Sequence, residues 1–180
     1  MIFIKEVKLK NGGVLFIRKP TIEDAENMSK YLNTIGGESD NLLFSKDDFH
    51  LSIEQEKDYI KNLTNNPNSI MLLGLINNEI ISVSGLITSS RKRIAHNSEF
   101  SISVKKAYWG LGVGNAIMDA TINFAKSTKM IKNISLGVKS DNANAIKLYA
   151  KHGFVKIGVH KNFFNIDGIY YDEILMDLNL

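Results

Sequence analysis

Three glycines on alternate positions, in the stretch "YWGLGVGNAI" of residues 108–117, constrain the fold of this chain more than any other feature. Just before them, the segment 97–104 alternates Phe100, Ile102 and Val104 with serines, and this period of two is typical of a β-strand. Just after them, apolar residues recur at helical spacing. The sequence therefore predicts a strand, a glycine-rich turn and a helix in immediate succession.

The glycine turn has the chemistry of an anion site. The first amide groups of a helix have no intrahelical acceptor, and the aligned peptide dipoles place about half a positive charge there. Gly110, Gly112 and Gly114 would leave these amides uncovered for a phosphate, although a tight turn without a ligand is the other interpretation. Two other phosphate loops are excluded, because Asn115 stands where a P-loop needs lysine and a dinucleotide fingerprint needs glycine.

A second stretch, "LGVKSDNANAIKLYAKHGF", follows the apolar segment "NISLGV", which predicts a strand in the middle of a sheet and buried on both faces. Asn142 and Tyr149 lie two helical turns apart with Ala145 between them, so we expect all three on one helix face. That face would begin at the carboxyl end of the strand and look into a crevice. The alternative is that Tyr149 is a half-buried core residue.

The order of the remaining elements predicts an α+β (mixed α/β) fold. Hairpin signals stand at "KNGG", "NNE" and "NIDG", and Thr21 and Ser52 are predicted to cap two helices between the first strands. Repeats, low-complexity tracts and linkers are not found, and the chain has only two prolines. We expect one domain over residues 1–180.

Composition excludes several classes of protein. The absence of cysteine excludes disulfides and thiolate metal sites, and we expect no metal. The longest apolar run, Ile70 to Ile76, is too short to cross a bilayer, and the first residues do not resemble a secretory signal. A cytoplasmic protein without a membrane partner is expected. The net charge of +3 is too small to predict nucleic-acid binding, despite the basic stretch "SRKR".

The charge is unevenly distributed along the chain. Between residues 38 and 58, seven acidic residues stand against two lysines. A solvated surface would explain this, but so would a cationic substrate. The acidic residues are Glu38, Asp40, Asp47, Asp48, Glu54, Glu56 and Asp58.

Together the two stretches resemble the GNAT superfamily of N-acetyltransferases, and the closing strands resemble its polyamine and ribosomal-protein-type branch. The family's motif Q/R-x-x-G-x-G/A is matched by "WGLGVG", and N-x-x-A-x-x-L-Y-x-x-x-G-F is matched completely from Asn142 to Phe154. The resemblance covers essentially the whole chain. It implies a twisted, mostly antiparallel sheet with a splayed strand pair and flanking helices.

The resemblance also implies acetyl-CoA as the cosubstrate. Trp109 replaces the family's glutamine or arginine, so phosphate binding would rest on the main-chain amides of residues 111–115, helped by Lys105 or Lys106. Asn142 would bind the pantetheine arm, which would pair with the strand before the turn. The residues carried over as cofactor-binding are Ile102, Val104, Trp109, Gly110, Leu111, Gly112, Val113, Gly114, Asn115, Asn142 and Tyr149.

By the same resemblance, a primary amine of a small molecule or peptide would attack the thioester directly. Tyr149 would protonate the leaving thiolate, and the Val104 N–H would hold the carbonyl oxygen. Glu99 is the predicted base, acting through water, and His96 or water alone are the alternatives; an ordinary exposed glutamate is the other interpretation of Glu99. The alternative function is a catalytically silent acetyl-CoA-binding sensor. A homodimer is an expectation from the resemblance alone.

Overall fold

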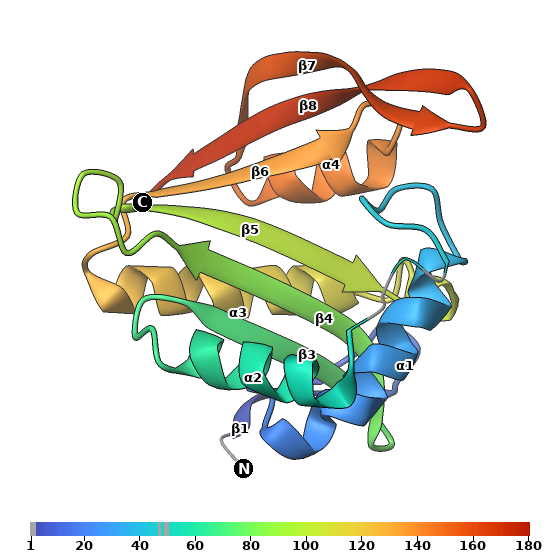
Figure 1. Cartoon of the computed structure of the whole chain (residues 1–180), viewed down its shortest axis with the longest axis vertical. Coiled ribbons are helices and arrows are strands. Elements are labelled where there is room, and N and C mark those ends of the chain that lie inside the picture. The colour runs from blue at the N-terminus through green and yellow to red at the C-terminus, as the bar shows by residue number, and fades with distance from the viewer. Residues whose placement is uncertain (1–2, 47, 49–50) are drawn as a thin grey trace.

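Eight strands in the described part of the chain form one sheet with the order β1-β2-β3-β4-β5-β6-β8-β7 (Figure 1). The computed structural model describes residues 3–46, 48 and 51–180, so Asp47 of the acidic segment lies outside the described residues. Neighbouring strands run antiparallel except β5 and β6, which are parallel. The mostly antiparallel mixed fold predicted from the sequence is confirmed. The strands are β1 (Phe3–Lys8), β2 (Val14–Arg18), β3 (Ile70–Ile76), β4 (Glu79–Thr88), β5 (Asn97–Val104), β6 (Asn133–Lys139), β7 (Val155–Ile166) and β8 (Ile169–Asn179).

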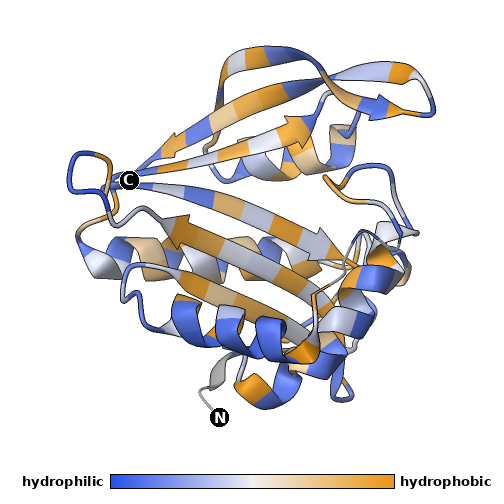
Figure 2. Ribbon diagram, viewed as in Figure 1, coloured by the Kyte–Doolittle hydropathy of each residue, from blue (hydrophilic) through white to orange (hydrophobic). Residues whose placement is uncertain are grey.

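Helices cover both faces of this sheet, and each pair packs on its own apolar cluster. Met28, Ile35 and Ile60 of α1 and α2 pack on one face of β3 and β4. The side chains of α3 pack on the other face, in a cluster that also contains side chains of α4 and β6. Figure 2 shows the apolar strands β3 and β4 behind the hydrophilic outer surface of α2. The helices are α1 (Ala25–Gly36), α2 (Ile53–Thr64), α3 (Val113–Thr128) and α4 (Ala143–Lys151), with short 3₁₀ turns at Ile22–Asp24 and Lys106–Tyr108.

The predicted local signals form as the sequence indicates. Ser52 caps α2 with a reciprocal pair of hydrogen bonds to Gln55, at 3.2 Å and 2.8 Å, and the Thr21 N–H donates to Asp24 at 2.8 Å. The hairpin between β3 and β4 turns through Asn77 and Asn78, both at positive φ. The predicted helix starts and hairpins are therefore confirmed.

The strands β5 and β6 separate after a short paired stretch. They pair from Asn97–Asn133 to Glu99–Ser135, and no further pair joins them within the described residues (Figure 1). The splayed strand pair implied by the resemblance is therefore present. The expectation that β6 is buried on both faces was wrong at Gly137, which is exposed, because β5 has already turned away there.

The two faces of β5 carry different chemistry. Phe100 is buried among the side chains of α3, and Ile102 and Val104 pack against the same cluster. Glu99, Ser101 and Ser103 alternate with them and therefore face the side of α1 and α2. The hydroxyls of Tyr31 on α1 and Ser103 lie 3.1 Å apart, which fixes this assignment. The sequence alone left open which face Glu99 occupies.

Candidate active site

A cleft of about 1310 Å³ opens where β5 and β6 separate. It runs from the glycine turn, past the divergent strands, to the inner sides of α1 and α2. Most of the residues predicted from the sequence line it together, although they come from separate elements. These are Glu99, Ile102, Val104, Trp109, Gly110, Gly112, Val113, Gly114, Asn115, Asn142 and Tyr149.

The three glycines at the turn serve two different purposes. Gly110 and Gly112 have φ values of 75° and 103°, and no described atom lies within 4 Å of where a Cβ would stand. They allow the left-handed turn and leave its surface open. A Cβ on Gly114 would lie 2.9 Å from Cδ2 of Leu148, so this glycine lets α3 and α4 approach closely. The predicted open turn at a helix start is present, and the third glycine also has a packing role.

The main-chain amides at this turn belong to the first residues of α3. Gly112 is the N-cap residue, and as a glycine it has no side chain that could accept from the first amides of the helix. The amides of Val113, Gly114 and Asn115 therefore keep the donor capacity that an anion site needs. Leu111 differs from its neighbours, because it does not line the cleft in the described structure and its carbonyl oxygen accepts from the Lys10 N–H at 3.1 Å.

Several lysines lie near the turn, and the sequence analysis named Lys105 and Lys106 as alternatives that could help to bind a phosphate. Lys106 lines the cleft, but the ammonium of Lys105 forms an ion pair with Glu79 at 2.5 Å. The sequence analysis missed Lys10, which lines the cleft from the β1–β2 hairpin. It also missed Lys151, whose ammonium donates to the Asn115 side chain at 2.8 Å. Only the folded sheet brings these distant lysines to the turn.

Trp109, the departure from the family motif, holds the end of β5. Its indole Nε1–H donates to the carbonyl oxygen of Val104 at 2.7 Å. The next residue, Lys105, donates its N–H to Ile81 of β4 at 2.9 Å. Because main-chain groups alternate along an antiparallel strand, those of Val104 and Ile102 point away from β4 and into the opening. The Val104 carbonyl is thus engaged by the indole, whereas its N–H points into the cleft.

Tyr149 and Asn142 share one face of α4 with Ala145, as predicted, and all three line the cleft. Tyr149 is 7% exposed and packs on Phe154, with ring centres 5.9 Å apart. Burial raises the pKa of its hydroxyl to about 12. None of the described residues forms a hydrogen bond with this hydroxyl, and burial is the sole cause of the raised pKa. Asn142 is the N-cap of α4, and its side-chain oxygen accepts from the Ala145 N–H at 3.2 Å.

The two candidate bases lie three residues apart near the start of β5. Glu99 lines the cleft at the last β5–β6 pair. His96 precedes β5 at the closed end, where its carbonyl accepts from the Lys132 N–H at 2.8 Å, and it is not among the described residues of the cleft. Of the two, Glu99 is the one that lines the cleft in the described structure.

The sequence analysis missed Glu173 and named Glu56 only as one acidic residue of the segment 38–58. Glu173 of β8 and Glu56 of α2 both line the cleft and are 9% and 2% exposed. Burial is the main cause that raises the pKa of each. Each stands in an ordinary amphipathic pattern, so only the sheet order and the helix packing show that they face the cleft.

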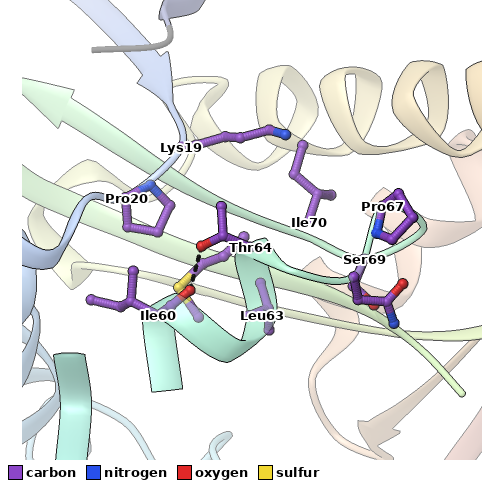
Figure 3. Close-up of a pocket in the computed structure, with 10 residues that line it drawn as sticks. Lys19, Pro20, Ile60, Leu63, Thr64, Pro67, Ser69 and Ile70 are labelled. Atoms are coloured by element: carbon purple, nitrogen blue, oxygen red, sulfur yellow. Dashed lines mark hydrogen bonds between the residues drawn. The ribbon is translucent and has the colours of Figure 1, made fainter. Parts of the chain in front are cut away.

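A second, much smaller pocket lies between the end of α2 and β3. Its volume is about 50 Å³, and Figure 3 shows Lys19, Pro20 and Ile70 around it. The Thr64 hydroxyl lines this pocket and donates a hydrogen bond to the carbonyl oxygen of Ile60, so it already has a partner within the protein. This pocket has room for about one or two water molecules.

The large cleft thus combines an uncapped helix start, an open strand edge and a buried phenol. Residues 40–154 match the family model described as "Acetyltransferase (GNAT) family". The chain belongs to the GNAT family. It is 30% identical over 114 residues to the L-amino acid N-acetyltransferase AaaT of Escherichia coli (strain K12), a match that covers 63% of this chain and 70% of that protein.

Solved GNAT structures share this fold. A GNAT acetyltransferase from Streptococcus pneumoniae is 28% identical with a TM-score of 0.89, over 92% of this chain and 99% of that one. The yncA protein of Salmonella typhimurium, solved with acetyl-CoA, has a TM-score of 0.80 at 18% identity, over 92% and 94% of the two chains. This GNAT protein is accordingly an N-acetyltransferase. Its described helices include none long and apolar enough to span a membrane, and its described residues include no cluster of metal-binding side chains.

Proposed function

We propose that this GNAT enzyme transfers the acetyl group of acetyl-CoA to a primary amine of a cationic small molecule or peptide. The observation that carries the proposal is the cleft, which passes through the splayed pair and has opposite chemistry on its two sides. Main-chain donors, lysines and Tyr149 line the side of α3 and α4, whereas carboxylates line the side of α1 and α2.

The donor side fits a diphosphate followed by a pantetheine arm. Gly110 and Gly112 leave open space over the first amides of α3, and Lys10 and Lys106 add positive charge beside them. The main-chain groups of Ile102 that point into the opening can pair with the amides of the arm. Asn142 uses its side-chain oxygen for the helix cap, so its NH₂ group is the part that would bind the arm.

Tyr149 is the proposed acid of the reaction. Its raised pKa of about 12 keeps the phenol protonated at neutral pH, as the leaving thiolate requires. Because the hydroxyl has no partner among the described residues, no hydrogen bond to the protein has to break before it donates. The Val104 N–H points into the same opening and would stabilise the negative charge that develops on the carbonyl oxygen.

The charges on the acceptor side support a cationic amine over an amino acid. Glu56, Glu99 and Glu173 line this side, and none of the described cleft residues is an arginine that could bind a substrate carboxylate. The ammonium of Lys139 is engaged by Asp141. The relative AaaT is named for L-amino acids, so we propose that the acceptor differs between the two proteins.

The experiment is CoA thiol release from acetyl-CoA in the presence of spermidine, an aminoglycoside, an N-terminal peptide, L-methionine and L-methionine amide, with products identified by mass spectrometry. We expect acetylated polycations or peptides, and faster turnover of the amide than of the free amino acid. A preference for the free amino acid would contradict the cationic acceptor. Thermal stabilisation by acetyl-CoA without thiol release for any amine would favour the sensor alternative.

A further inference from the structure

The carboxylate of Glu173 lies beside the opening of the splayed strands. In the sheet, Glu173 stands opposite Lys139 of β6 and His160 of β7, so its side chain projects on the face of α1 and α2. It lies over Gly137, where an added Cβ would overlap with the carboxylate. Gly137 is two residues beyond Ser135, the last residue of β6 that pairs with β5. The missing side chain of Gly137 thus makes room for the carboxylate at this opening.

The cations around Glu173 do not neutralise it. Lys139, its cross-strand neighbour, donates instead to both carboxylate oxygens of Asp141 at 2.7 Å and 2.6 Å, and its ammonium lies 3.5 Å from the ring centre of Tyr171. His160 is 59% exposed and its Nδ1 is 3.9 Å from the Glu173 carboxylate, beyond hydrogen-bond distance. Within the described residues, Glu173 is therefore a cleft carboxylate without a hydrogen-bond donor.

Glu99 completes the surroundings of this carboxylate. It is the last residue of β5 that pairs with β6, and it faces the same side of the sheet and lines the same cleft as Glu173. Burial raises the pKa of Glu173, His160 lowers it, and the negative charge of Glu99 raises it further. The two carboxylates thus influence one another across the opening, and a bound cation would relieve their repulsion.

We infer that Glu173 is the catalytic residue that removes the proton from the acceptor ammonium, while Glu99 holds that ammonium beside it. This inference rests on the proposed acetyl transfer. An N–H bond of the ammonium breaks and Glu173 gains the proton. The free amine bonds to the acetyl carbon as the carbon–sulfur bond breaks. The thiolate takes the proton of Tyr149, and the second proton lost by nitrogen replaces it. Glu173 releases its proton to water, so the products are an amide, the CoA thiol and one proton.

The test compares Glu173→Gln with the wild type over pH 6–10, using two amines of different basicity. For spermidine, whose amines resemble a lysine amine with a pKa of about 10.4, kcat/KM of the wild type should reach a plateau well below that pH. In the variant it should fall about 100-fold at pH 7 and rise tenfold per pH unit toward the pKa of the amine. For glycinamide, with an α-amino pKa of about 8, the loss at pH 7 should be much smaller.

Substitution of residues next to Glu173 should change the pH at which kcat/KM for spermidine reaches its plateau. Glu99→Gln should shift it to lower pH and weaken spermidine binding, whereas His160→Gln should shift it to higher pH, because the two residues act on Glu173 in opposite directions. Glu6→Gln, on exposed β1 outside the cleft, is the matched control and should leave the profile unchanged.

Equal losses for both amines at every pH, or an unchanged plateau in Glu173→Gln, would overturn the inference while leaving the acetyl transfer established. Absence of any wild-type turnover would instead reject the proposed function, and this inference with it. Thermal melting and acetyl-CoA affinity of the variant provide the folding control. We expect both to be retained, because the substitution removes a charge that burial disfavours.

Discussion

The indole of Trp109 donates a hydrogen bond to the carbonyl oxygen of Val104 at 2.7 Å and so ties the glycine turn to the end of β5. This contact positions the proposed phosphate site and the strand edge together. Trp109→Phe keeps an aromatic ring but removes the donor. Since one such hydrogen bond contributes about 1 kcal/mol, we expect the dissociation constant for acetyl-CoA to rise about fivefold, measured by calorimetry.

The matched control for Trp109 is Tyr170→Phe, which changes an exposed aromatic residue outside the cleft. It should leave acetyl-CoA affinity unchanged. Equal affinity in Trp109→Phe and the wild type would show that the turn keeps its position without the indole.

The close approach of Gly114 to Leu148 predicts a coupled pair. Gly114→Ala places a Cβ 2.9 Å from Cδ2 of Leu148, and we expect a loss of about 1 kcal/mol in unfolding free energy, measured with urea. In a Leu148→Ala background the same change should cost nothing, because the contact is gone. An additive double mutant would contradict the packing role assigned to this glycine.

Removal of the Tyr149 hydroxyl should separate chemistry from binding. Tyr149→Phe is expected to lower kcat about 100-fold with acetyl-CoA affinity retained. Because burial raises the pKa of Tyr149 to about 12, the phenol stays protonated and the ratio of wild-type to variant kcat should be constant from pH 7 to 10. The raised pKa of Tyr149 also contributes to the stability of the fold. This contribution is complete below pH 10, the ordinary pKa of tyrosine, and is lost as the pH rises toward 12.

Steady-state kinetics across this pH range provide the measurement. A ratio that shrinks above pH 9 would mean that the phenol ionises below the raised pKa of about 12, and would contradict the effect of burial on Tyr149. Equal kcat for Tyr149→Phe and the wild type would remove Tyr149 from the reaction altogether.

The sequence was most informative where local patterns control structure. The cap at Ser52, the asparagine hairpins and the helix face of Asn142 and Tyr149 follow from spacing alone, and the structure contains each of them. Sequence separation limited the prediction of the site. The position of Glu173 over Gly137 depends on β8 pairing with β6, and periodicity within either strand carries no information about that pairing.

The pair of Arg18 and Asp24 predicts a pH-dependent contribution to stability. Two hydrogen bonds of 2.6 Å join them, and both side chains are about nine-tenths buried. Burial raises the pKa of Asp24, but the hydrogen bonds from Arg18 and Thr21 outweigh it and lower the pKa overall. Asp24→Asn should therefore lower the unfolding free energy by about 2–3 kcal/mol at pH 7, measured by urea denaturation.

The sign of the pH effect follows from this lowered pKa. The stabilisation is present above the ordinary pKa of aspartate, near 4, and is lost as the pH falls through the folded-state value. The difference in unfolding free energy between the wild type and Asp24→Asn should thus become smaller below pH 4. Glu26→Gln breaks a solvent-exposed pair with Lys30 and should leave the unfolding free energy almost unchanged at every pH. A gap that stays constant with pH would contradict the ionic role of Asp24.

Glu56 offers a test in which stability and function change in opposite directions. It is 2% exposed, and its Oε1 accepts no hydrogen bond from any described residue. Burial raises its pKa, so the fold loses stability as the pH rises above the ordinary value for glutamate. Glu56→Met fills the same space without a charge, and we expect it to raise the melting temperature at pH 8 but hardly at pH 4.

The same substitution removes a carboxylate from the acceptor side of the cleft. The KM for spermidine should rise about tenfold in Glu56→Met, whereas the KM for acetyl-CoA, bound on the other side, should stay constant. Glu54→Met is the matched control, since Glu54 lies two residues away on α2, is exposed and pairs with Lys57. A higher melting temperature with an unchanged KM for spermidine would assign Glu56 to the fold alone and leave Glu99 and Glu173 as the carboxylates that select the amine.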